Sequence, residues 1–134
     1  MQKIKTMKAV IHTDEAPEPI GPYSHAIQVG DTLYISGQIA IDPVEGELII
    51  TSIEEETNQV LQNVGAILRA ADMEYDDVVK CTIYVRALED YDQINMVYGR
   101  YFSDEDGPAR ELVEVSALPK DVRIEISAIA IKTT

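Results

Sequence analysis

Two charged side chains in the second half of the chain could together act on a small organic acid. Arg110 follows Pro108 at the start of a predicted strand, and a guanidinium can hold a carboxylate through two parallel hydrogen bonds. Glu125 lies on the non-core face of the last predicted strand, where a partly desolvated carboxylate can orient a water molecule and act as a general acid or base. On residue type alone, the simpler interpretation is that Arg110 pairs at the surface with Glu111 or Glu105, and that Glu125 is solvated.

The charge of the chain limits what it can bind. Its 24 acidic and 11 basic side chains give a net charge of −13. Nucleic-acid-binding proteins neutralise phosphates with lysine and arginine, so this surface is predicted to repel RNA, DNA and anionic membranes. It also gives a small anion little long-range attraction. Such a ligand must therefore be held by a local cation, and Arg110 is a candidate.

Four further positions could contact a small ligand. Tyr23, in the turn Gly21-Pro22-Tyr23-Ser24, could present its ring and hydroxyl, although tyrosine is equally common at subunit interfaces. Ser36 and Gly37 end a strand, where a glycine allows close backbone approach to a ligand or marks a β-bulge. Asn95 is polar on an apolar helix face, where a supporting role is as common as a binding one.

The sequence gives no sign of a metal or cofactor site. His12, His25 and the single cysteine, Cys81, lack metal-ligand spacing, and we expect His25 at the surface and Cys81 in the core. Phosphate-binding glycine loops and Ser-His-Asp arrangements are not evident. Because there is one cysteine, no signal peptide and no apolar run of membrane-spanning length, we expect a soluble, cytoplasmic protein.

Hydrophobic periodicity predicts six strands and two helices. The strands are expected at 9–11, 26–29, 32–36, 79–85, 109–116 and 122–131, with Val79, Cys81, Ile83 and Val85 on one face of the fourth. Gly30-Asp31 is typical of a hairpin turn. The first helix begins at Ser52, with Glu55 at capping-box spacing and Glu56 off the apolar face, and ends near 71–72. The second follows Asp90.

These elements predict an α/β single domain, an α+β mixed sheet with two helices packed on one face. The opposite face would be uncovered and would carry Tyr34, Thr82 and Ile129. Self-association is the economical way to bury a partly apolar sheet face, so we expect a homo-oligomer.

An ordered set of motifs covers nearly the whole chain after Met7. It comprises Gly21-Pro22-Tyr23-Ser24, Ser36-Gly37-Gln38, Asp42-Pro43, Asn95 with Tyr98, Pro108-Ala109-Arg110, Leu118-Pro119-Lys120 and Ile124-Glu125-Ile126. In order and spacing, this set resembles the RidA/YjgF family of imine deaminases. We accordingly expect residues 1–7 to be an N-terminal extension and residues 8–134 to be a RidA/YjgF-like domain.

The resemblance implies a chorismate-mutase-like subunit in a homotrimer with clefts between subunits. It implies hydrolysis of 2-aminoacrylate and 2-iminopropanoate to pyruvate and ammonia, without metal or cofactor, with other 2-imino acids as further candidate substrates. Arg110 and Glu125 would be the catalytic residues. The substrate-binding residues would be Tyr23, Ser36, Gly37, Asn95 and Leu112.

Leu112 departs from the family pattern, in which cysteine, threonine or serine follows the arginine by two residues. Leucine costs little if this position contributes only backbone groups, and it lowers activity or shifts substrate preference if the side chain matters. The alternative is therefore a 2-oxo-acid-binding protein or a regulatory protein, with little catalytic turnover. A ribonuclease or translation inhibitor, a role attributed to some members, is disfavoured by the net charge of −13.

Overall fold

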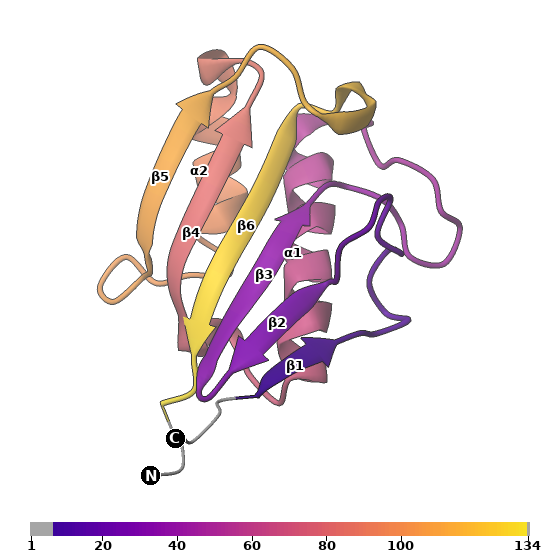
Figure 1. Ribbon diagram of the computed structural model, residues 1–134. Coiled ribbons are helices and arrows are strands. Elements are labelled where there is room, and N and C mark those ends of the chain that lie inside the picture. The colour runs from indigo at the N-terminus through magenta and orange to yellow at the C-terminus, as the bar shows by residue number, and fades with distance from the viewer. Residues whose placement is uncertain (1–6, 134) are drawn as a thin grey trace, which may run out of the picture.

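Six strands form one mixed sheet in the order β1-β2-β3-β6-β4-β5 (Figure 1). The computed structural model describes residues 7–133. β4 and β5 run parallel, and the other neighbouring strands are antiparallel. The strands are β1 (Lys8–Ile11), β2 (Ala26–Val29), β3 (Thr32–Gln38), β4 (Val78–Val85), β5 (Ala109–Glu114) and β6 (Ile124–Ile131). The predicted mixed sheet is confirmed.

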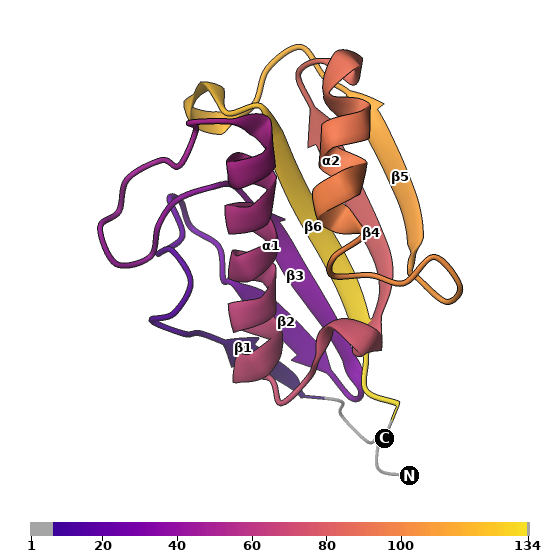
Figure 2. The same cartoon turned by 180° about the vertical axis from the view of Figure 1, so that it is seen from behind.

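Two α-helices, α1 (Ile53–Ala70) and α2 (Tyr91–Tyr98), cover one face of the sheet (Figure 2). α2 connects the parallel strands β4 and β5, which is the crossover that alternating helix and strand predict. Short 3₁₀ turns precede β4, α2 and β6; they are η1 (Tyr75–Asp77), η2 (Leu88–Asp90) and η3 (Pro119–Asp121). Within the described residues, no helix has the length and apolar character needed to cross a bilayer.

Alternation along the strands decides which side chains face the helices. In β6, Ile124 and Ile126 are fully buried while Glu125 between them points to the opposite face, as predicted. The prediction for β4 was wrong at Val79, which is 38% exposed, whereas Val78 is buried. The β4–β6 pairing shifts register here, so β4 holds one extra residue and Val79 lies outside the alternation.

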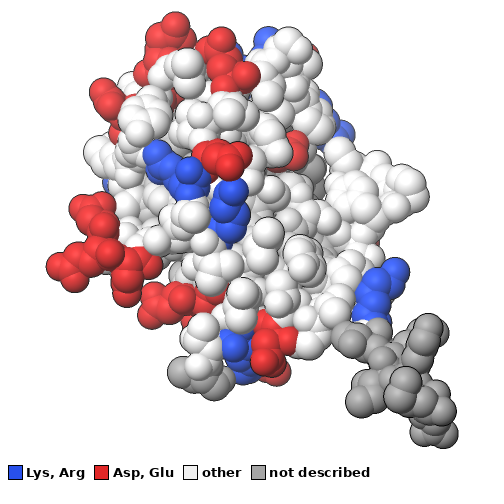
Figure 3. All heavy atoms as spheres, turned by 60° about the vertical axis from the view of Figure 1, so that its left-hand side comes forward, with Lys and Arg blue, Asp and Glu red and all other residues white. Residues whose placement is uncertain are grey.

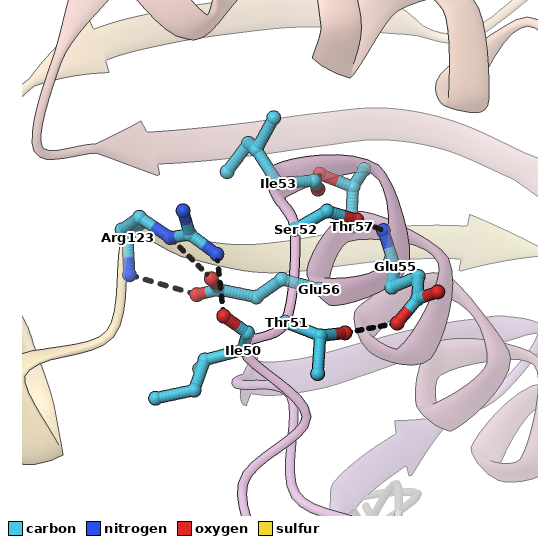
Figure 4. A network of polar contacts seen from close by, with 8 residues as sticks. All are labelled: Ile50, Thr51, Ser52, Ile53, Glu55, Glu56, Thr57 and Arg123. Carbon is cyan, nitrogen blue, oxygen red and sulfur yellow. Dashed lines mark hydrogen bonds and ion pairs between the residues drawn. The ribbon is translucent and has the colours of Figure 1, made fainter.

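A polar network fixes the start of α1 (Figure 4). The Ser52 side chain accepts a hydrogen bond from the Glu55 backbone N–H, but the Glu55 carboxylate contacts the Thr51 hydroxyl, so the predicted capping box is only half formed. Glu56, expected off the apolar face, is fully buried. Its carboxylate accepts from the backbone N–H and from Nε of Arg123, each at 2.8 Å. This ion pair joins the start of α1 to the start of β6.

The face of the sheet opposite the helices is open (Figure 1). Tyr34 is 50% exposed there, and Thr82 and Ile129 are half-buried, so the predicted partly apolar face is confirmed. Of the expected N-terminal extension, only Met7 falls within the described residues.

Candidate functional site

Glu125 sits in a hollow on the open face of the sheet. Four of the predicted site residues line this hollow together, namely Tyr23, Ser36, Gly37 and Glu125, with Ile20, Ile39 and Pro119 around them. Glu125 is half-buried, and burial raises the pKa of its carboxyl above the usual range. A carboxylate that releases its proton only at higher pH is suited to act as a general base.

Gly37 makes room for that carboxylate. A Cβ at position 37 would collide with the Glu125 side chain. The β3–β6 pairing is also irregular between Ile35 and Gln38, so the bulge interpretation of this glycine is confirmed, and close approach to a ligand stays a prediction. The group that approaches closely is the protein's own carboxylate.

The other two predicted site residues of this hollow, Tyr23 and Ser36, form hydrogen bonds with backbone groups. The Ser36 hydroxyl donates to the carbonyl of Ser24 at 2.6 Å, so it joins the turn to β3. The Tyr23 hydroxyl accepts from the backbone N–H of Ile20 at 3.3 Å, and Tyr23 is 45% exposed. The hydroxyl proton of Tyr23 therefore remains available to a ligand, whereas the Ser36 hydroxyl proton is already used.

Arg110 lies on the other face of the sheet. It pairs in register with Cys81, which is fully buried on the helix side as predicted, and paired residues of neighbouring strands point to the same face. Glu111 points the opposite way and binds Lys80 at 3.0 Å. Among the described residues, no carboxylate lies within 4.0 Å of the Arg110 guanidinium, so the interpretation of Arg110 as an ion-paired surface residue is not supported.

Two tyrosines of α2 hold the guanidinium instead. Arg110 Cζ lies 4.8 Å from the ring centroid of Tyr98 and 5.8 Å from that of Tyr91. Arg110 Nη2 also donates to the Tyr91 hydroxyl at 3.4 Å. Neither tyrosine was among the predicted site residues. The available signal was their spacing: Tyr91, Asn95 and Tyr98 follow one another at i, i+4 and i+7 on one helix face.

A second hollow lies beside Arg110, between α2 and the loop before β5. Asn95, Tyr98 and Arg110 line it, with the acidic residues Asp104 and Glu105 at its rim. Figure 3 shows this side of the molecule, where a few basic side chains lie on a largely uncharged surface with acidic groups around them. Leu112 does not line either hollow and packs its side chain against the core.

The structure therefore divides the predicted site into two halves. One half, around Glu125, opens on the uncovered face of the sheet. The other, around Arg110 and Asn95, opens on the helix side at the edge strand β5. A single chain does not bring the two charged groups together.

The position of His25 differs from the prediction made from the sequence. His25, expected at the surface, is 2% exposed; its Nδ1 accepts from the Thr13 N–H and its Nε2 donates to the Pro17 carbonyl. The ring of His12 stacks on it, and the ligand atoms of His12, Asp14 and Glu18 lie within 4.8 Å of one another. All three are exposed, and exposed acidic groups of this kind are common without an ion, so we assign no metal site to them.

Known proteins resemble this chain over almost its full length. The family model described as Endoribonuclease L-PSP matches residues 13–132. The chain belongs to the RidA/YjgF family. RutC family protein PH0854 of Pyrococcus horikoshii is 54% identical, over 94% of this chain and 99% of its own length. The human 2-iminobutanoate/2-iminopropanoate deaminase is 45% identical, over 94% and 91%.

Solved structures of the RidA/YjgF family share this fold. The crystal structure of the YjgF gene product of E. coli matches with a TM-score of 0.88 and 40% identity, over 93% of this chain and 99% of that one. The six-stranded sheet with two helices is thus the fold of the family.

Proposed function

We propose that this protein hydrolyses 2-imino acids, with 2-iminopropanoate and its enamine tautomer 2-aminoacrylate as substrates and pyruvate and ammonia as products. The observation that carries the proposal is the half-buried Glu125 carboxylate, which lies over Gly37 in an open hollow beside Tyr23. The human relative named as an imine deaminase supports it.

Glu125 acts on water in this proposal. Its carboxylate accepts a proton from a water molecule as the water oxygen attacks the C=N carbon. That proton passes to the nitrogen, which gives a carbinolamine. The proton of its hydroxyl group then passes through Glu125 to the same nitrogen, the C=O bond forms as the C–N bond breaks, and ammonia leaves a 2-oxo acid behind. General acid–base catalysis of this kind is worth about 10²–10⁴-fold. That is sufficient for imines, which already hydrolyse in water.

Arg110 holds the substrate's carboxylate. Its guanidinium is stacked on Tyr98 and has no carboxylate partner among the described residues, so its hydrogen-bond donors are available to a ligand. Leu112 can contribute backbone groups alone, because its side chain packs against the core. β5 is an edge strand, and the outward-facing N–H and C=O groups of an edge strand have no strand partner.

The complete site forms between two copies of the chain. Glu125 and Arg110 open on opposite faces of one sheet, so a neighbouring copy must bring its Arg110 to the Glu125 hollow. The partly apolar open face around Tyr34 and Ile129 supplies a surface for that contact. We propose a homotrimer with such a cleft at each interface.

A coupled assay tests the activity. 2-Aminoacrylate is generated in situ by a PLP-dependent serine dehydratase, and pyruvate release is followed with and without this protein. Acceleration by the wild type, lost in Arg110→Ala, is the expected result. Release that is no faster with the wild type than without it contradicts the proposal.

Leu112 favours one alternative, a 2-oxo-acid-binding or regulatory protein with little turnover. Binding of 2-oxobutanoate that depends on Arg110, without acceleration of imine hydrolysis, would support this alternative. The net charge of −13 continues to disfavour RNA as a substrate.

A further inference from the structure

The guanidinium of Arg110 has a buried side and an exposed side. Tyr98, 8% exposed, lies against it at 4.8 Å from Cζ to the ring centroid. Tyr91, 44% exposed, borders it at 5.8 Å and does not line the hollow that Arg110 shares with Asn95. The guanidinium can therefore be reached from that hollow or from the side of Tyr91, and a ligand on the latter side lies beside the exposed Tyr91 ring.

The contact between Tyr91 and Arg110 leaves the tyrosine proton unused. Arg110 Nη2 donates to the Tyr91 hydroxyl at 3.4 Å, longer than a typical hydrogen bond. A phenol can also donate one proton. Among the described residues, the Tyr91 hydroxyl donates to none. Nη2 belongs to both two-nitrogen edges of a guanidinium, so a carboxylate held through either edge has one oxygen on the nitrogen that contacts this hydroxyl.

We propose that Tyr91 is a further substrate-binding residue, whose hydroxyl donates a hydrogen bond to the same carboxylate that Arg110 holds. This inference rests on the proposed role of Arg110. The carboxylate of a 2-imino acid keeps its charge while the C=N bond is hydrolysed. The Tyr91 hydroxyl therefore stabilises the bound substrate and the transition state equally, and its effect falls on KM.

The hydroxyl can be removed while the ring is kept. In Tyr91→Phe, we expect the Kd for 2-oxobutanoate, a stable analogue of the substrate, to rise about tenfold in isothermal titration calorimetry. KM for imine hydrolysis should rise by a similar factor, with kcat within about twofold of wild type. Tyr101→Phe is the matched control, because it removes a tyrosine hydroxyl that contacts Asn58 and lines neither hollow, so it should change neither value.

The outcomes separate this inference from the proposed function. If the wild type binds 2-oxobutanoate, Arg110→Ala abolishes binding and Tyr91→Phe leaves the Kd unchanged, the role of Tyr91 is wrong and that of Arg110 stands. If wild-type binding does not depend on Arg110, both are wrong. A fall in kcat with KM unchanged also overturns the inference, because the hydroxyl would then act on the chemical step.

Discussion

The carboxylate of Glu125 occupies the space in which any side chain at Gly37 would lie. The two residues come from the neighbouring strands β6 and β3, where the pairing is irregular. Gly37 is not among the described glycines with positive φ, which are Gly30 and Gly46, so its backbone conformation does not require a glycine. The requirement comes from the carboxylate that lies above it.

Gly37→Ala should therefore displace the carboxylate and lower kcat for imine hydrolysis by about 100-fold, toward the lower limit of what general base catalysis contributes. Circular dichroism should show an intact fold. Ser127→Ala, on the same face of β6, is the control and should retain wild-type kcat. A Gly37→Ala variant with full activity would show that the position of this carboxylate does not matter.

The raised pKa of Glu125 predicts how activity depends on pH. Burial raises the pKa of the carboxyl. As the pH is lowered, Glu125 should therefore become protonated, and lose its function as a base, at a higher pH than an ordinary glutamate does. The acid limb of the kcat/KM profile should reflect this pKa, and Glu125→Gln should remove the activity together with the limb. Arg110 of a neighbouring copy would act in the opposite direction, so the position of the limb reflects burial against that guanidinium. An acid limb that persists in the residual activity of Glu125→Gln would contradict the assignment of Glu125.

The same pKa shift has a consequence for stability. A raised folded-state pKa means that the folded chain binds this proton more tightly than the unfolded chain. The associated stability is present below the unfolded-state pKa and lost as pH rises through the folded-state value. At neutral pH, Glu125→Gln should therefore be at least as stable as wild type, with any advantage disappearing at acid pH. Urea unfolding at the two pH values measures this, and a marked loss of stability at neutral pH would contradict it.

The buried ion pair between Glu56 and Arg123 should matter for folding (Figure 4). Glu56→Gln leaves Arg123 without its charge partner. We expect a loss of roughly 2–3 kcal/mol in the free energy of unfolding, below the range for fully buried pairs because the Arg123 side chain is partly exposed. Glu54→Gln, in the same turn of α1, is the control and should cost less than about 0.5 kcal/mol. Equal unfolding midpoints for the two variants would show that the ion pair contributes nothing.

Leu112→Cys restores the residue type found in well-studied deaminating members of the family. Because the Leu112 side chain packs against the core, we expect a stability loss of about 1–2 kcal/mol from the smaller side chain. The rate of imine hydrolysis should stay close to that of wild type. A large gain in rate would show that the side chain at this position takes part in the reaction.

Local patterns predicted the elements of this fold well. Alternation in β6 and the turn at Gly30 gave the correct strands, and the apolar stripe of α1 gave the correct helix. The misplaced residues depend on contacts between distant segments. Val79 lies at a bulge in the β4–β6 pairing, and Glu56 is buried because Arg123 reaches it from a position 67 residues away.

In the candidate site, too, the residue types could be predicted but the contacts between distant segments could not. The family resemblance predicted Arg110 and Glu125 as site residues. It could not show that their side chains lie on opposite faces of one sheet, because this depends on the register of β4 with both of its neighbouring strands. Tyr91 and Tyr98 were not among the predicted site residues. Their contact with Arg110 arises from the crossover, which places α2 beside β5.

Subunit complementation tests the composite site most directly. Arg110→Ala and Glu125→Gln should each be inactive alone as folded proteins. Co-expressed in equal amounts, they should regain about a quarter of wild-type imine hydrolysis, since random mixing pairs an intact Arg110 with an intact Glu125 in about that fraction of interfaces. Mixed oligomers that form but remain inactive would contradict a site built from two copies of the chain.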